Sequence, residues 1–124
     1  MRTIKVENGY GLDRITITEN PVPEVGEHEV LVKVHAVSLN QLDIMVAEGI
    51  FGTPLPHVLG SDAAGVVVQV GSSVKHFAVG DRVCTHFIQD WQDGQLKAEY
   101  LKSRLGTGVN GVFAEYISLS GQAL

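Results

Sequence analysis

Apolar and polar residues alternate over the first third of the chain. Three segments, residues 4–6, 15–17 and 30–36, place an apolar side chain at every second position. This period of two is typical of half-buried antiparallel strands. Turn residues separate the segments, because residues 8–11 favour a hairpin and residues 20–26 predict a longer loop. The pattern therefore predicts a barrel or sandwich of short strands.

Two short helices and more strands are expected in the rest of the chain. Residues 40–48 predict a helix that ends at Gly49, because apolar side chains recur on one helical face. Residues 96–105 contain neither Gly nor Pro and predict a second helix. Strands are expected over residues 63–70, 82–87 and 112–119.

Two glycine-marked motifs occur in the middle of the chain. Gly60-Ser61-Asp62 precedes the strand expected at 63–70, and Gly80-Asp81-Arg82-Val83 follows that strand. In this order they resemble the GroES-like catalytic domain of medium-chain dehydrogenase/reductases. The resemblance implies a mainly β fold with short helices, a twisted and partly open β-barrel formed by residues 1–124. It also implies that the nucleotide-binding Rossmann domain of the family is absent from these residues.

The same resemblance implies an NAD(P)-dependent oxidoreductase. Such an enzyme transfers hydride to or from a carbonyl, an alcohol or an activated alkene. NAD(P)H is expected to bind mainly to the missing domain, so we expect this chain alone to be inactive. The alternative is a GroES-like binding or assembly module that acts without catalysis. A continuation of the gene product with a strand, a GxGxxG motif and a helix would favour the enzyme.

The residues at the zinc positions of the family predict a zinc-free member. Asn40 aligns with a ligand cysteine of the zinc enzymes, and Ser61 aligns with a ligand histidine; a hydroxyl that keeps its proton is a poor zinc ligand. Gln41 and Leu42 stand where those enzymes carry an anion-contacting residue and a proton relay. Cys84 is the only cysteine, which excludes an intramolecular disulfide and a four-cysteine zinc lobe. We interpret Cys84 as a small buried hydrophobe rather than a reactive thiol.

Asn40 is the expected catalytic residue. Without a metal, its amide would stabilise negative charge that develops on a substrate oxygen. Asn40 also fits the N-cap of the expected helix, and both roles can hold together. Structural roles compete for Asp43 and Asp62, which could pair with Arg82 or cap turns, and a structural role is also favoured for His86. The remaining residues expected in the substrate and cofactor cleft are Gln41, Asp43, Ser61, Asp62, His86 and Phe87.

Two further features have competing interpretations. Residues 106–111 match the GxGxxG string of dinucleotide-binding folds, which requires a strand before it and a helix after it. Here a strand is expected after it, so we interpret these glycines as a flexible connector. Trp91 lies in a polar loop and is expected to pack beneath that loop, with a lid over a pocket as the alternative.

Length, composition and charge narrow the classes of function. The 124 residues, 44% of them hydrophobic, fit one folded domain, and a net charge of −5 disfavours nucleic acid as a partner. No apolar run approaches the roughly 20 residues of a membrane span, and residues 1–7 lack a signal-peptide core, so the cytoplasm is the expected location. A small-molecule substrate is expected. An apolar face left uncovered by the missing domain would favour a homo-oligomer.

Overall fold

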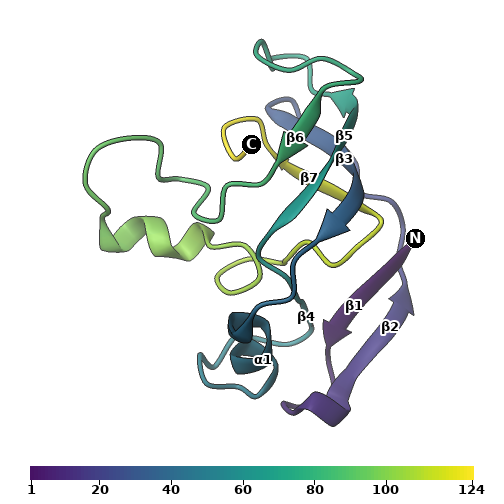
Figure 1. Cartoon of the computed structure of the whole chain (residues 1–124), viewed down its shortest axis with the longest axis vertical. Coiled ribbons are helices and arrows are strands. Elements are labelled where there is room, and N and C mark those ends of the chain that lie inside the picture. Colours follow the sequence, from purple (N-terminus) through teal and green to yellow (C-terminus); the bar gives the residue numbers. More distant parts are fainter.

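The computed structural model describes all 124 residues, arranged as two antiparallel sheets connected by turns and short helices (Figure 1). One α-helix, α1, covers Gln41–Ala47, and 3-10 turns occur at Leu12–Arg14 and Ala98–Ser103. None of these helices is long and apolar enough to cross a membrane. The strands are β1 (Arg2–Val6), β2 (Ile15–Glu19), β3 (Glu29–Val37), β4 (His57–Val58), β5 (Ala63–Val70), β6 (Arg82–Cys84) and β7 (Tyr116–Ser120).

The sheets have the strand orders β2-β1-β4 and β6-β5-β3-β7. In the larger sheet Val32 is the register partner of Val67 on β5 and of Ile117 on β7. An isolated bridge between Thr3 and Ala114, with main-chain bonds on either side of it, links β1 to the segment that leads into β7. The sheets therefore approach each other without closing into a continuous barrel, in agreement with the open β fold expected from the sequence.

The hydrophobic core is formed mainly by the inward face of the larger sheet. Val30, Val32 and Val67 are fully buried there, together with Leu105 and Val112 from the connecting segments. Burying one such side chain contributes on the order of 2 kcal/mol to folding. The alternation seen in the sequence thus reports which face of β3 and β5 lies against this core.

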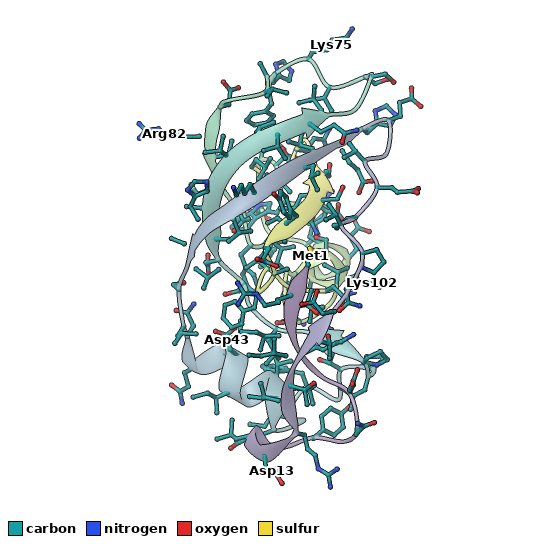
Figure 2. The ribbon with its side chains drawn as sticks, turned by 90° about the vertical axis from the view of Figure 1, so that its right-hand side faces the viewer. Met1, Asp13, Asp43, Lys75, Arg82 and Lys102 are labelled. Carbon is teal, nitrogen blue, oxygen red and sulfur yellow. The ribbon has the colours of Figure 1, made fainter.

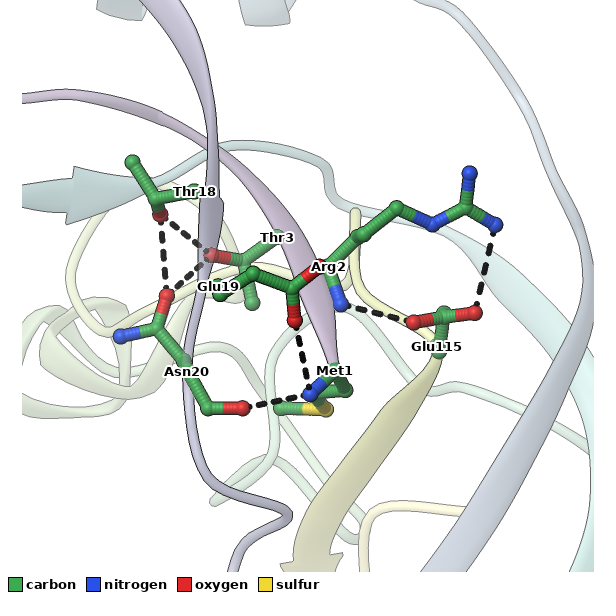
Figure 3. Close-up of polar contacts among 7 residues, drawn as sticks. All are labelled: Met1, Arg2, Thr3, Thr18, Glu19, Asn20 and Glu115. Atoms are coloured by element: carbon green, nitrogen blue, oxygen red, sulfur yellow. Dashed lines mark hydrogen bonds and ion pairs between the residues drawn. The ribbon is translucent and has the colours of Figure 1, made fainter.

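A polar network holds the N-terminus in place (Figure 3). The Met1 amino group donates to the Asn20 carbonyl oxygen at 2.6 Å, which fixes the start of β1 against the end of β2. Arg2 donates to the Glu115 carboxylate from its main-chain nitrogen at 2.7 Å and from its guanidinium at 3.3 Å. Thr3 donates to the Asn20 side chain at 2.6 Å. These bonds connect three distant segments and orient β1 across the molecule.

The predicted helices and strands are largely confirmed, with five differences. The strand expected over residues 82–87 ends at Cys84, and the two-residue strand β4 was not expected. Residues 96–105 contain a 3-10 helix over Ala98–Ser103 rather than a longer α-helix. The strand expected from residue 112 begins only at Tyr116, because the preceding main chain pairs elsewhere: Phe113 donates to the Leu59 carbonyl and accepts from Ile4. Residues 8–11 do not form a tight hairpin, since the β1–β2 connection continues through the 3-10 turn at 12–14.

The burial expected for Cys84 is wrong. Its thiol is exposed, because β6 turns Val83 toward the core and Arg82 and Cys84 away from it. Trp91 is half-buried, its indole N–H donates to the Gly94 carbonyl oxygen of its own loop at 3.0 Å, and it stays outside the core cluster.

Candidate functional site

Four chain segments converge around the N-terminus of α1. The end of β3 is tied to the Gly60-Ser61-Asp62 motif because Ser38 N–H donates to the Asp62 carbonyl oxygen at 3.2 Å. The start of β5 is tied to the segment after β6, since Ala63 N–H donates to the Thr85 hydroxyl at 3.0 Å. These contacts bring the expected site residues of α1 and of the motif to one end of the larger sheet, at the α1 end of the molecule, where Figure 2 labels Asp43.

Asn40 caps α1 and still exposes its side chain. Its main-chain N–H donates to the Asp43 carboxylate at 2.8 Å, the reciprocal contact of a capping box. Its side-chain Nδ2 donates to the Ser38 hydroxyl at 2.9 Å and makes a longer contact of 3.4 Å with the Ser38 carbonyl oxygen. The amide is therefore held by one good hydrogen bond, and its second N–H is available to a better acceptor. The N-cap role is confirmed, and the structure leaves room for a second role.

Asp43 is a buried carboxylate beside a second one. Burial raises its pKa, and the nearby charge of Asp62 raises it further, while the hydrogen bond from Asn40 acts in the opposite direction. Ser61 is buried and its hydroxyl donates to the Asp62 carboxylate at 2.5 Å. Arg82 is exposed and forms no ion pair, so the expected pairing with either carboxylate does not occur. The site consequently holds two neighbouring carboxyl groups and one exposed amide donor.

Two cavities flank this cluster. One of about 450 Å³ has an apolar interior with Asn40, Gln41 and Asp43 among its lining residues, and the other, of about 390 Å³, is lined by Asp62, Cys84 and Thr85 among others. A third apolar cavity of about 340 Å³ shares Ile4, Leu39 and Phe113 with the first. Apolar cavities with a few polar groups are the usual form of small-molecule sites. The polar cluster therefore lies at the edge of a continuous apolar surface.

Glycines fix the backbone that carries Ser61 and Asp62. Gly60 has a φ of +102°, and a Cβ there would meet the ring of Phe113. Gly106 and Gly111 lie against the same main chain, where a Cβ would come within 2.7 Å of the Gly60 carbonyl carbon and within 2.5 Å of the Leu59 carbonyl carbon respectively. Gly106 and Gly111 therefore serve close backbone packing under the site, whereas Gly108 packs against the main chain of Lys102. The expected flexible connector is in fact a tightly packed one.

His86 and Phe87 lie away from the cluster. His86 Nε2 is 2.8 Å from the Trp91 carbonyl oxygen, and its main-chain N–H donates to the Ala123 carbonyl oxygen at 2.6 Å. Phe87 packs against the hydrophobic core. Neither side chain lines the two cavities that flank Asn40 and Asp62. The structure supports the structural interpretation of His86 and gives Phe87 a packing role.

Sequence reasoning missed four residues that shape the site. Ser38 fixes the Asn40 amide, Thr85 anchors Ala63, Phe113 forms a wall of the apolar cavity, and Cys84 lines the neighbouring one. Ser38 was detectable as a polar residue two positions before an N-cap. The other three come from distant segments, and no local pattern marks them.

The donor set around Asn40 does not fit a zinc ion. The chain contains no group of three or more His, Cys, Asp and Glu side chains placed to hold a metal. Asn40 and Ser61 offer an amide and a hydroxyl, both poorer zinc ligands than thiolate or imidazole. The nearby carboxylates of Asp43 and Asp62 are already engaged by Asn40 N–H and by the Ser61 hydroxyl.

The fold is an open, mainly β domain with a polar cluster beside an apolar cavity. Comparison with known proteins makes this specific, because residues 26–124 match the alcohol dehydrogenase GroES-like domain. The chain belongs to this family, a part of the medium-chain dehydrogenase/reductases. The expected family is thereby confirmed.

Individual relatives agree with this assignment. A zinc-type alcohol dehydrogenase-like protein of Schizosaccharomyces pombe is 38% identical over 117 residues, which is 92% of this chain and 34% of that protein. A chloroplastic NADPH-dependent alkenal/one oxidoreductase of Arabidopsis thaliana is 47% identical over 77 residues, 59% of this chain and 20% of that protein. The cobalt- and zinc-bound thermostable alcohol dehydrogenase of Pyrobaculum aerophilum superposes with a TM-score of 0.84 at 27% identity, over 99% of this chain and 40% of that one. The chain thus spans about a third of the length of the first of these curated relatives.

Proposed function

We propose that this chain is the substrate-binding part of an NAD(P)-dependent oxidoreductase that acts without zinc. Its substrate class is an aldehyde or ketone, the corresponding alcohol, or an alkene activated by a carbonyl group. The cofactor is held mainly by a nucleotide-binding domain outside these residues, so the chain by itself is inactive. The family assignment supports the oxidoreductase class, and the apolar cavity beside Asn40 supports an uncharged substrate. The cytoplasm remains the proposed location.

One observation carries the proposal: the exposed Asn40 amide at the edge of an apolar cavity. NAD(P)H, when bound, supplies the hydride. As hydride adds to carbon, the electron pair of the polarised double bond moves onto the substrate oxygen, which then takes a proton from water. A donor aimed at that oxygen lowers the barrier because the charge is larger in the transition state than in the substrate. The Asn40 Nδ2 group is suited to this, because it has two N–H donors and makes only one short hydrogen bond, to the Ser38 hydroxyl.

The other residues of the cluster act through Asn40 and its surroundings. The Asp43 carboxylate fixes the Asn40 main chain, and the Ser38 hydroxyl fixes its side chain. The hydrogen bond from the Ser61 hydroxyl holds the Asp62 carboxylate against Ser61. We assign these residues positioning roles. Gln41 differs, because it lines the same cavity as Asn40 and offers a further polar contact to the substrate.

The zinc-free assignment rests on the donor set described above, and metal analysis tests it. The protein, purified in zinc-containing medium and dialysed, is expected to carry far less than one zinc per chain. A stoichiometric zinc content that resists dialysis would overturn this part of the proposal, and it would leave the oxidoreductase class standing.

Kinetics of an Asn40 variant tests the catalytic role. In the complete gene product, Asn40→Ala is expected to lower kcat about 100-fold or more, as loss of one oxyanion donor typically costs about 3 kcal/mol, while KM for NAD(P)H changes little. Asn8→Ala is the matched control, because Asn8 is an exposed asparagine whose side chain makes no hydrogen bond. Unchanged kcat with a raised substrate KM would assign Asn40 to binding. No turnover by the parent protein with aldehydes, alcohols, enones or quinones would favour the binding-module alternative.

A further inference from the structure

A second polar pocket lies at the end of the larger sheet opposite to α1. Because β3 runs antiparallel to β5 and β7, the start of β3 meets the ends of β5 and β7 there. The pocket has a volume of about 410 Å³ and is formed by the turns at 28, 73–76 and 120–122. Figure 2 shows Lys75 at this end and Asp43 near the other, so the pocket is separate from the Asn40 cluster.

Main-chain bonds build the pocket from its three turns. Gly121 N–H donates to the His28 carbonyl oxygen at 3.0 Å, and Ser73 N–H donates to the Glu27 carbonyl oxygen at 3.0 Å. Gln92 reaches in from another loop and donates to the Gln122 carbonyl oxygen at 2.8 Å. The turns are therefore held in fixed relation to one another, and the pocket has a defined shape.

Three side chains that carry or can carry positive charge line this pocket without protein partners. Lys75 forms no ion pair, and the rings of His28 and His76 make no hydrogen bond. The main-chain N–H groups of Lys75 and His76 also lack an acceptor in the protein. All three residues are exposed, in a chain with 9 Lys and Arg against 14 Asp and Glu. These unpaired donors are suited to an anion.

The acidic residues next to the pocket do not line it. The Glu27 carboxylate accepts the Ser73 hydroxyl at 2.6 Å, and the Glu29 carboxylate accepts Gly26 N–H at 2.9 Å. Lys75 forms no ion pair with either carboxylate, so its ammonium group remains available to a ligand. Protonation of either histidine would add to the positive charge that faces the pocket.

We propose that this pocket binds a divalent tetrahedral oxyanion, such as sulfate or a phosphate group, through Lys75, His28 and His76. Sulfate is the better first probe, because it is a dianion throughout the neutral range, whereas phosphate is a mixture of mono- and dianion there. The site does not depend on the proposed dehydrogenase activity, and its ligand does not take part in hydride transfer. Inorganic phosphate and a phosphate monoester would then show which form of the anion fits.

Nuclear magnetic resonance of the histidine rings in the full chain tests the proposal. At pH 6.0, sodium sulfate is expected to shift the His28 and His76 signals to saturation, and sodium chloride at equal ionic strength is not. A Lys75→Gln/His76→Gln variant is expected to bind at least tenfold more weakly, because charge-assisted contacts are lost. Lys102→Gln is the matched control for removal of one exposed positive charge and is expected to bind like the parent.

Three results would overturn the proposal. Linear shifts without saturation, or equal shifts at His35 and His86, would show nonspecific screening by salt. Unchanged sulfate affinity in the double variant would place any binding elsewhere. The double variant and the Lys102→Gln control must both keep the dispersed amide spectrum of the parent. If the double variant does not, a Lys75→Gln single variant replaces it.

Discussion

Replacing Gly60 by alanine tests the packing that holds the polar cluster in place. The φ of +102° at Gly60 is strained for any residue with a Cβ, which costs about 1–2 kcal/mol. The added methyl would also lie 2.7 Å from Phe113 Cε1 and 2.8 Å from its Cγ, and such overpacking of a buried site costs about 1–3 kcal/mol. We therefore expect Gly60→Ala to lower the free energy of unfolding by about 2–5 kcal/mol, a large share of the roughly 5–15 kcal/mol of a typical domain.

Gly80→Ala is the matched control for this experiment. Gly80 has a φ of +99°, and an added Cβ there meets nothing within 4 Å. It should therefore cost only the backbone strain, about 1–2 kcal/mol. Urea unfolding followed by circular dichroism gives both values, and the difference between the two variants measures the clash with Phe113.

A double-mutant cycle isolates that contact. In a Phe113→Ala background the ring is gone, so Gly60→Ala is expected to cost about as little as Gly80→Ala does in the parent. Equal destabilisation by Gly60→Ala and Gly80→Ala in the parent would refute the reasoning, because it would mean that the ring moves aside without cost.

Three more predictions concern titratable groups and assembly. Burial lowers the pKa of His57 below its ordinary 6.5, and the hydrogen bond with the Gly106 main chain partly offsets this. The native state therefore binds fewer protons than the unfolded chain, and stability should fall as the pH drops from about 6.5 toward the lowered pKa. In thermal unfolding His57→Gln should flatten this decline, and a variant curve parallel to that of the parent would contradict the prediction. The pKa of Asp43 is raised above 3.8, so its contribution to stability is lost as the pH rises through that raised pKa. Asp43→Asn should therefore be at least as stable as the parent at pH 7. Asp43→Ala leaves Asn40 N–H without its acceptor and should lower the free energy of unfolding by about 1 kcal/mol in urea titrations. The apolar surface around Ile17 and Leu39, which are 70% and 84% exposed, should make the 124-residue chain self-associate, and the chain should not bind NAD(P)H. A strictly monomeric species in light scattering would contradict the first expectation, and micromolar cofactor affinity in calorimetry would contradict the second.

The sequence alone determined most of the strands, the short helix and the family, whereas strand β4 and the late start of β7 were not predicted from it. Alternation along β1, β2 and β3 and the apolar face of residues 41–47 are local patterns, and a local pattern needs only the backbone periods of strand and helix to be interpreted. Asn40 followed three positions later by Asp43 is a capping pair in the sequence, and it is one in the structure. The order of the Gly60-Ser61-Asp62 and Gly80-Asp81-Arg82-Val83 motifs carried the family assignment, which the comparison with known domains confirmed.

Only the tertiary structure decided which residues share the site and which do not. His86 and Phe87 are near the motif in the family pattern, yet the loop that follows β6 turns one toward Trp91 and the other into the core. Phe113 is 73 positions from Asn40 along the chain and lines the same cavity, because its main chain pairs with Leu59 across the molecule. The exposure of Cys84 depended on which face of a three-residue strand met the core, and the alternation of so short a strand does not define it. Contacts between segments that are distant in sequence follow from packing and main-chain pairing, and these are properties of the whole fold.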